Sequence, residues 1–293
     1  MPFSGLMTAL VTPFSNGKPC EETFRATVRR QIEGGVDGLV PCGTTGEAPT
    51  LSAYEQDLVI EWCVDEAAGR VPVLAGIGGN NTAQVIETAM RVEALGADGV
   101  LATTPYYNKP TQDGLIAHFS AIAEATKLEV CLYDVPGRTI TNIDPTTVAE
   151  LAQHDNITAI KDATGDMANA MEIMRLCGDK INLLSGDDFT TLPFLAQGGD
   201  GVISVASNLV PDEMKRLVDA SKGGELTEAQ ALTKKLFPLF SALFCESNPI
   251  PVKAAMSMVG LMSGEIRLPL TVISDDASAR LSAALSDLGL LGR

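Results

Sequence analysis

Apolar runs of strand length recur along this sequence, with helix-like segments between them. The runs lie at residues 6–11, 38–41, 71–75, 99–103, 130–133, 158–161, 181–184 and 201–205. Their near-continuous Val, Ile, Leu and Ala content is typical of parallel strands that helices cover. In the intervening segments, apolar residues recur at spacings of three and four, as within residues 85–92, which indicates amphipathic helices. Eight such units predict an α/β fold, a (β/α)8 TIM barrel, with a doubly wound open sheet as the competing arrangement.

Glycine and aspartate recur together just before three of the runs, at residues 35–39, 96–100 and 199–202. Glycine is the residue that most often ends a helix, because it adopts the left-handed conformation at little cost. We interpret the three segments as helix stops of one kind, each followed by a strand. They support the count of eight units.

The strand pattern stops after Asn208, and helical patterns follow at residues 211–221, 227–245, 249–262 and 275–288. We therefore predict a barrel domain over residues 1–208 and a C-terminal helical region over residues 209–293. This region either covers one side of the barrel or serves in assembly, and the pattern allows both.

The chain is strongly acidic, with a formal net charge of −16 over 293 residues and a pI near 4.5. It offers no basic stripe that could displace counterions from a phosphate backbone, which argues against nucleic acid as a partner. No apolar run reaches the roughly 18 to 20 residues needed to span a bilayer, so we expect no membrane partner. Residues 1–5 lack the features of a secretory signal, and we predict a cytoplasmic protein.

Neither the cysteines nor the histidines suggest a metal site. The six cysteines are scattered without a Cys-x-x-Cys pair, so a disulfide framework is not expected either. Only His118 and His154 could offer an imidazole, and neither has a partner at ligand spacing.

In a barrel of this kind, chemistry takes place at the C-terminal ends of the strands. Lys161 ends the sixth run, directly after the apolar residues 157–160. An amine with apolar neighbours loses hydration of its charged form, which leaves some free base able to attack a ketone. The alternative interpretation is a surface lysine beside Asp162.

Three further groups leave the same predicted face. Gly43 and Gly46 flank two threonines, and such a turn can present backbone N–H groups to a carboxylate, although a plain strand-to-helix turn has the same pattern. Tyr133 ends the fifth run, one barrel position from Lys161, where its phenol could exchange a proton with an imine or could simply be a core aromatic. The planar fork of Arg138 suits a carboxylate, and an exposed solubilising arginine is the alternative.

This set of motifs closely resembles the dihydrodipicolinate synthases, now described as 4-hydroxy-tetrahydrodipicolinate synthases, which are class I pyruvate-dependent aldolases. The resemblance runs from Leu6 through the helical tail, and its motifs lie at residues 43–47, 106–110, 133–139, 160–165, 185–188 and 201–205. It implies a lyase that condenses pyruvate with L-aspartate 4-semialdehyde through a lysine Schiff base. The product would be 4-hydroxy-tetrahydrodipicolinate, in the first committed step of lysine and diaminopimelate biosynthesis. No cofactor is implied, because the lysine itself supplies the electron sink.

The resemblance also assigns a role to each matching side chain. Lys161 forms the imine with pyruvate, and Tyr133 donates and accepts the protons. Thr44 links Tyr133 to Tyr107 in a proton relay. The remaining assignments are binding roles: Thr45 for the pyruvate carboxylate, Ile203 for backbone contacts to pyruvate, and Arg138 for the carboxylate of the semialdehyde.

Assembly follows from the same resemblance. In the family, Tyr107 crosses from a neighbouring subunit and two dimers usually form a tetramer, so a homotetramer is implied here. Aromatic residues are enriched at interfaces, and the Tyr-Tyr pair at 106–107 is consistent with one. The alternative is a loop folded over its own barrel.

Many members of the family are inhibited by lysine, which binds a cavity at the dimer interface near Asn80 and Tyr106. Lysine-sensitive bacterial members often carry histidines where this chain has Ala53 and Gln56, and a glutamate where it has Gln84. A neutral amide cannot balance an ammonium group, and alanine offers no hydrogen bond. We therefore expect weak or absent inhibition by lysine.

Two other functions compete. Another pyruvate aldolase, such as N-acetylneuraminate lyase or a keto-deoxy sugar acid aldolase or dehydratase, shares the lysine and the tyrosine. Those enzymes generally differ in the threonine pair and in the Tyr-Tyr and Arg-Thr segments, all of which are present here. A non-catalytic barrel protein would lack at least one reactive group, and none is missing.

Overall fold

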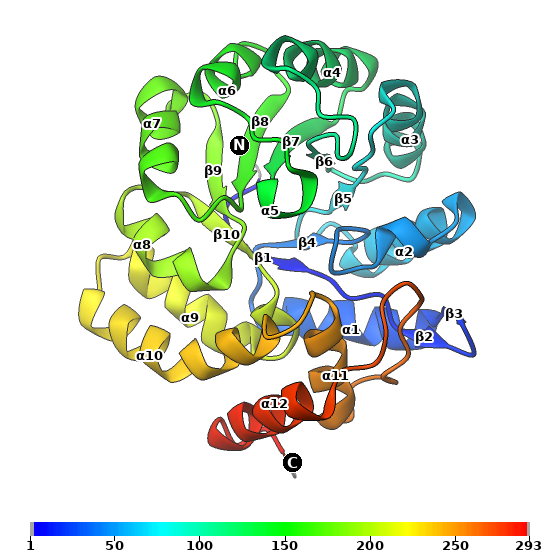
Figure 1. Ribbon diagram of the computed structural model, residues 1–293, viewed down its shortest axis with the longest axis vertical. Helices are drawn as coiled ribbons and strands as arrows, with labels where there is room; N and C mark the ends of the chain where they lie inside the picture. The colour runs from blue at the N-terminus through cyan, green and yellow to red at the C-terminus, as the bar shows by residue number, and fades with distance from the viewer. Residues whose placement is uncertain (1–2, 292–293) are drawn as a thin grey trace.

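Eight parallel strands form a barrel at the centre of the protein, and helices surround it (Figure 1). The computed structural model describes residues 3–291. The strand order is β4-β1-β10-β9-β8-β7-β6-β5, and a parallel bridge between Leu39 and Val73 joins the two ends. The predicted barrel is thus confirmed over the open sheet. Its strands are β1 (Gly5–Ala9), β4 (Gly38–Val40), β5 (Leu74–Gly76), β6 (Gly99–Thr103), β7 (Glu129–Asp134), β8 (Ile157–Asp162), β9 (Asn182–Ser185) and β10 (Gly201–Ser204).

One strand is displaced from its predicted position. The apolar run at 71–75 predicted the third strand, but β5 begins only at Leu74. Pro72 has no N–H to donate to a strand ladder, and the N–H of Val73 donates to the Asp98 carboxylate at 2.8 Å. The other predicted strands differ from the observed ones by two residues or fewer at either end.

The longer helices that follow the strands cover the outside of the barrel, whereas the short α5 lies over the barrel mouth (Figure 1). Helix α9 comes after the last barrel strand and packs against β1. Gly34, at the end of α1, lies against Pro211, the first residue of α9. The helices are α1 (Glu21–Glu33), α2 (Ala53–Ala67), α3 (Thr82–Ala94), α4 (Gln112–Ala125), α5 (Pro136–Thr139), α6 (Pro145–Leu151), α7 (Met167–Cys177), α8 (Thr191–Ala196) and α9 (Pro211–Lys222). Short 3₁₀ turns are η1 (Ala48–Thr50), η2 (Asp188–Thr190) and η3 (Ala206–Asn208).

Helices α10 (Leu226–Leu243), α11 (Ile250–Met258) and α12 (Asp275–Asp287) lie along one side, shown in yellow to red in Figure 1. Helix α11 is shorter than the predicted 249–262, because Gly260 with φ +75° takes the chain out of the helical conformation. The division at residue 208 stays a prediction, and residues 1–2 and 292–293 lie outside the described range. No helix within residues 3–291 is long and apolar enough to cross a membrane.

The glycine–aspartate segments end helices and also fasten strands. Gly35 and Gly96 have φ near +80°, as expected for helix stops, whereas in the third segment the left-handed residue that follows α8 is Gly198. Each aspartate carboxylate accepts a 2.8 Å hydrogen bond from a backbone N–H at or next to the start of the barrel strand that comes before it in the chain. The donors are Leu6 for Asp37, Val73 for Asp98 and Leu183 for Asp200. One device is therefore repeated around the N-terminal end of the barrel.

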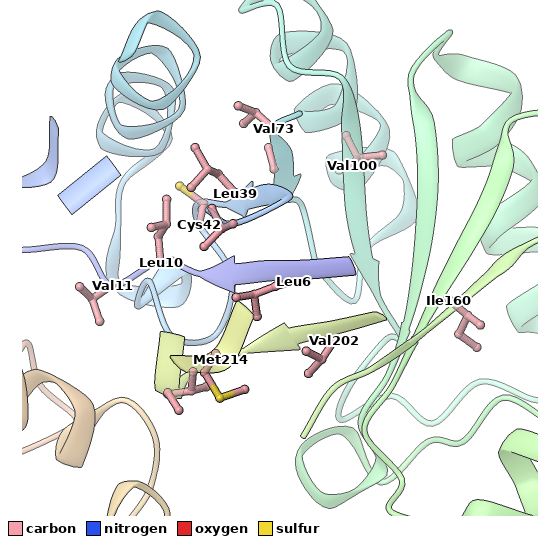
Figure 2. Packing of buried hydrophobic residues seen from close by; sticks show 14 of the residues in the cluster. Leu6, Leu10, Val11, Leu39, Cys42, Val73, Val100, Ile160, Val202 and Met214 are labelled. Carbon is pink, nitrogen blue, oxygen red and sulfur yellow. The ribbon is translucent and has the colours of Figure 1, made fainter. Parts of the chain in front are cut away.

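Alternation along the strands divides the core into two layers. Outward residues pack under the helices, and Figure 2 shows Leu6 of β1 and Val202 of β10 beside Met214 of α9. Inward residues form a second cluster that includes Met7, Ala159 and Tyr133, and Phe3 belongs to it at the N-terminal end. The carbonyl of Phe3 accepts a 2.7 Å bond from Asn182 at the start of β9. The inner layer therefore closes one end of the barrel.

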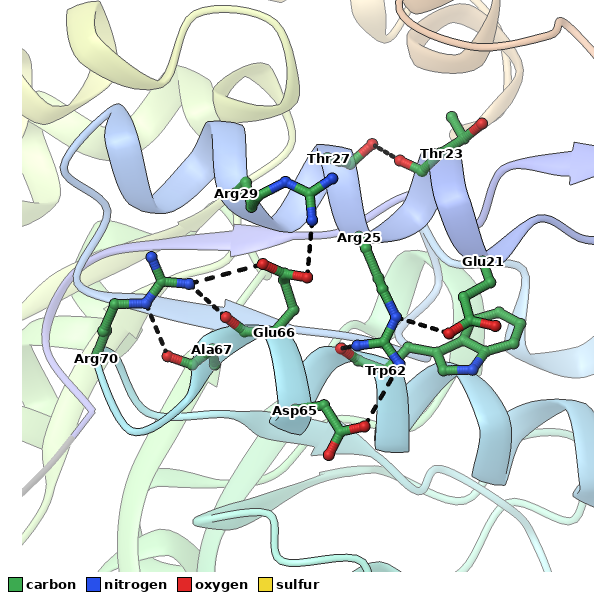
Figure 3. A network of polar contacts seen from close by, with 10 residues as sticks. All are labelled: Glu21, Thr23, Arg25, Thr27, Arg29, Trp62, Asp65, Glu66, Ala67 and Arg70. Atoms are coloured by element: carbon green, nitrogen blue, oxygen red, sulfur yellow. Dashed lines mark hydrogen bonds and ion pairs between the residues drawn. The ribbon is translucent and has the colours of Figure 1, made fainter.

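Ion pairs join α1 to α2 on the surface (Figure 3). Arg29 meets Glu66 at 2.9 Å, and Arg25 reaches both Glu21 at 2.8 Å and Asp65 at 3.4 Å. Pairs as exposed as these contribute about 0 to 1 kcal/mol each, so burial of the outer layer is the larger stabilising effect.

A two-stranded hairpin, β2 (Phe14–Ser15) and β3 (Lys18–Pro19), precedes α1 and was not predicted. Its turn is Asn16-Gly17, and both residues have positive φ, at +52° and +74°. An Asn-Gly pair is a strong hairpin signal, but strands of two residues carry no alternation to accompany it.

Candidate active site

Lys161 and Tyr133 lie side by side inside the barrel, near the C-terminal ends of β8 and β7. The two residues are paired in the strand register, so the predicted adjacency is confirmed. The Lys161 Nζ lies 4.3 Å from the centroid of the Tyr133 ring. Lys161 is only 6% exposed, and none of the ion pairs within residues 3–291 includes it. The alternative of a solvated surface lysine is therefore wrong.

The segment after β4 forms a tight loop in which Thr45 is buried and Thr44 is half-buried. Both residues that flank the loop, Cys42 and Glu47, have φ +55°, an unfavourable conformation for residues with a Cβ. A Cβ on Gly46 would stand 3.2 Å from the Leu10 carbonyl oxygen, which leaves little room there for a larger residue. The hydroxyl of Thr44 makes no hydrogen bond to a tyrosine within the described residues, so the relay stays a prediction.

Asn248 is a site residue that the sequence reasoning missed. It precedes α11, is 6% exposed, and donates from Nδ2 to the Thr45 hydroxyl oxygen at 3.0 Å. Its backbone carbonyl accepts a 3.2 Å bond from Arg138, which lies exposed on α5. Its side-chain oxygen is buried without a partner. The C-terminal region thereby contacts both groups predicted to bind carboxylates.

Ile203 on β10 is buried among the inward residues, in the same cluster as Tyr133. The strand end that carries it is held by Asp188, whose carboxylate accepts bonds from the Ser204 hydroxyl at 2.6 Å and from two backbone N–H groups at 3.1 and 2.9 Å. Burial raises the pKa of Asp188 to about 6. Asp188 belongs to the motif at residues 185–188, but the sequence reasoning gave it no role.

A cavity of about 520 Å³ opens beside Tyr133 and Arg138. Thr44 lines it, whereas Lys161, Thr45 and Ile203 do not. Four of the five positions predicted for an effector pocket line the same cavity: Gln56, Asn80, Gln84 and Tyr106. The fifth, Ala53, is exposed at the start of α2 and outside the lining. In this chain the barrel mouth and the predicted effector pocket are therefore continuous.

The loop after β6 carries two tyrosines, of which Tyr106 lines the cavity and Tyr107 is exposed. Tyr106 is 42% exposed and Tyr107 is 90% exposed, with φ +72° at Tyr107. Asn108 donates to the Asn80 carbonyl at 2.8 Å, and Asn80 donates to the Tyr106 carbonyl at 3.2 Å. The loop is thus tied to its own chain while Tyr107 stays uncovered. The choice between a subunit interface and a loop folded over its own barrel stays a prediction.

Two buried carboxyl groups come directly after Tyr133 and Lys161 in the sequence. Asp134 and Asp162 occupy paired positions on β7 and β8, at 1% and 4% exposure. Burial raises the pKa of Asp134 to about 7, opposed by a bond from the Ile143 N–H and reinforced by the charge of Asp162. Burial likewise raises the pKa of Asp162. Their side chains alternate with those of Tyr133 and Lys161, as successive strand residues do.

The sequence belongs with known proteins over nearly its whole length. The Dihydrodipicolinate synthetase family matches residues 2–288. A 4-hydroxy-tetrahydrodipicolinate synthase from Geobacter sp. (strain M21) is 52% identical over 289 residues, which is 99% of this chain and 100% of that protein.

Solved structures agree. The dihydrodipicolinate synthase from Aquifex aeolicus superimposes with a TM-score of 0.97 at 41% identity, over 99% of this chain and 100% of that one. The DHDPS from Cyanidioschyzon merolae, solved with lysine bound, gives a TM-score of 0.96 at 40% identity over 99% of both chains. Fold, length and sequence thus agree, and the chain is a member of the dihydrodipicolinate synthetase family.

Proposed function

We propose that this protein is a 4-hydroxy-tetrahydrodipicolinate synthase, a lyase that condenses pyruvate with L-aspartate 4-semialdehyde in lysine and diaminopimelate biosynthesis. The observation that carries the proposal is the buried Lys161 amine, which lies beside the Tyr133 ring and has no carboxylate partner among residues 3–291. Family membership and relatives at about half identity support it.

In the proposed reaction, the Lys161 Nζ attacks the keto carbon of pyruvate to form a carbinolamine, and loss of water gives the imine. Loss of a methyl proton converts the imine to an enamine, whose carbon attacks the aldehyde of the second substrate. The Tyr133 phenol moves the protons in these steps. Thr45 binds the pyruvate carboxylate with backbone from the Ile203 strand end, and Arg138 binds the carboxylate of the semialdehyde. Thr44 and Tyr107 complete the proton relay.

Reduction with borohydride in the presence of pyruvate tests the imine. The expected result is a stable pyruvate adduct on the peptide that contains Lys161, and its absence from Lys161→Ala. A coupled assay with the semialdehyde then separates this activity from that of another pyruvate aldolase. Pyruvate release from sialic acid or a keto-deoxy acid, without condensation of the semialdehyde, would contradict the proposal.

Two threonine variants separate binding from proton transfer. Thr45→Val should chiefly raise the KM for pyruvate, whereas Thr44→Val should chiefly lower kcat, and Thr44→Ser serves as the control that keeps the hydroxyl. Arg138→Ala should lower kcat/KM for the semialdehyde by an amount equivalent to about 1.5 to 3 kcal/mol, the range for charge-assisted hydrogen bonds. Unchanged semialdehyde kinetics in Arg138→Ala would refute the role of that residue.

We further propose a homotetramer, made of two dimers in which Tyr107 completes the partner's site. The 90% exposure of this aromatic side chain supports an interface there. Sedimentation velocity should give a tetramer, and a fully active monomer would contradict it. Six unpaired cysteines support a cytoplasmic location.

Inhibition by lysine should be weak or absent. The Gln56 amide already donates to the Ala48 carbonyl at 3.0 Å, and Asn80 is engaged with Tyr106. No carboxylate lines this cavity in the described chain, so a bound ammonium would lack a counter-charge. Gln84→Glu should increase sensitivity to lysine, and strong inhibition of the unmodified protein at micromolar lysine would refute the expectation.

A further inference from the structure

The loop that carries Thr44 and Thr45 is held in an unfavourable backbone conformation. Cys42 before it and Glu47 after it both have φ +55°. Residues with a Cβ keep such a conformation only where their surroundings impose it. The contacts of Glu47 are therefore relevant to where the two threonines lie.

Both carboxylate oxygens of Glu47 are taken by the C-terminal region. Oε1 pairs with the ammonium of Lys253 on α11, and Oε2 accepts a 3.0 Å bond from the backbone N–H of Arg267. The side chains of the ion pair are 0% and 1% exposed. The ring of Phe14 lies against both cations, at 4.1 Å from the Lys253 Nζ and 4.4 Å from the Arg267 Cζ. The opposite charges of Glu47 and Lys253 are thus buried together and compensate each other.

A second attachment reaches the same loop from the same segment. Asn248, five residues before Lys253, donates to the Thr45 hydroxyl at 3.0 Å, and its carbonyl accepts from Arg138. The beginning of α11 therefore holds the loop at Thr45 and again at Glu47. It also contacts the arginine on the other side of the barrel mouth.

We propose that Glu47 is a positioning residue whose buried pair with Lys253 sets the place of Thr44 and Thr45 over the barrel mouth. Glu47 does not line the cavity and acts through the loop. The C-terminal helices then contribute to pyruvate binding by holding this loop, beyond packing or assembly. This inference rests on the proposed function, because it concerns the group that binds the pyruvate carboxylate.

Two variants test it. Glu47→Asp keeps both charges but shortens the side chain by one methylene, which shifts the attachment of the loop. The double variant Glu47→Gln with Lys253→Met removes both charges, so neither partner is left buried and uncompensated. Leu281→Ala, at a fully buried position on α12, is the control for a loss of stability without contact to the loop.

Both test variants should raise the KM for pyruvate by about tenfold, because a displacement of about 1 Å in a binding group has effects of this order or larger. The KM for the semialdehyde should change less, and amide exchange within residues 43–50 should accelerate. The control variant Leu281→Ala should keep the KM for pyruvate of the unmodified protein, even though its Tm falls by as much as that of the test variants or by more. Should the double variant fail to fold, Glu47→Asp alone decides the question.

A KM for pyruvate within twofold of the unmodified protein in the folded test variants would overturn the inference and leave the ion pair a purely structural role. The borohydride experiment on the unmodified protein distinguishes a failure of the proposed function from a failure of the role proposed for Glu47. Absence of an adduct there would overturn the proposed function itself. A normal adduct together with unchanged KM in the variants would overturn only the role of Glu47.

Discussion

The carboxyl group of Asp134 makes the stability of this protein depend on pH in a way that can be calculated. The side chain is 1% exposed, its Oδ2 accepts a 3.1 Å bond from the Ile143 N–H, and its Oδ1 is buried without a partner. Burial is the main cause that raises its pKa from 3.8 to about 7. The folded protein therefore favours the protonated carboxyl.

Between these two pKa values the folded state binds more protons than the unfolded state, so stability falls as the pH rises. The shift of about 3 pH units corresponds to about 4 kcal/mol of stability, which is fully present below pH 3.8 and is lost as the pH rises through 7. Asp134→Asn cannot titrate. Its amide leaves a donor without a partner, which costs about 1 to 3 kcal/mol at every pH and does not affect the slope.

The free energy of unfolding, measured in urea for the unmodified protein and for Asp134→Asn, should diverge with pH. Relative to the unmodified protein, the variant should gain about 4 kcal/mol between about pH 4 and about pH 8. Leu281→Ala removes no titratable group and should show a difference that does not vary with pH. A difference for Asp134→Asn that is the same at both ends of the range would refute the reasoning.

Three other substitutions have defined outcomes. Asn248→Ala removes the donor to Thr45 and should raise the KM for pyruvate about fivefold, equivalent to about 1 kcal/mol, in steady-state assays. Gly76→Ala would place a Cβ 2.1 Å from a backbone carbonyl of the loop after β4, and thermal unfolding should show a loss of about 3 kcal/mol or more. Ser204→Ala removes a 2.6 Å bond to the Asp188 carboxylate and should destabilise by about 1.5 to 3 kcal/mol. Urea unfolding should show a smaller effect of Ser204→Ala below pH 6, where that carboxyl is protonated.

The fold could be predicted because its signals are local and repeated. A run of apolar residues defines β6 at its observed bounds, and the run that ends at Lys161 lies within β8. Strand periodicity also predicted that Lys161 and Tyr133 would be neighbours, since consecutive strands of a parallel barrel pair in order. Family membership followed from motifs that follow these strands, and it is confirmed. The roles of the individual residues stay predictions.

The contacts from the C-terminal region could not be predicted in the same way. Asn248 lies 203 residues from Thr45, and Lys253 lies 206 residues from Glu47. Periodicity reports which face of an element is buried, but it does not report which distant element covers that face. One signal was present: Lys253 interrupts an otherwise apolar stretch of the predicted helix 249–262. A charged residue in such a place usually has a buried partner.

The junction between β4 and β5 has a consequence for how the barrel fluctuates. Only the Leu39–Val73 bridge joins these strands, with backbone bonds from Leu39 to Pro72 at 3.0 Å and from Gly76 to Pro41 at 2.9 Å. Regions with few protected bonds open first, so native-state hydrogen exchange should release these amides before that of Leu132 in β7. Gly76 also lines the cavity. Transient opening of the barrel between β4 and β5 should therefore occur on the side where small molecules would enter.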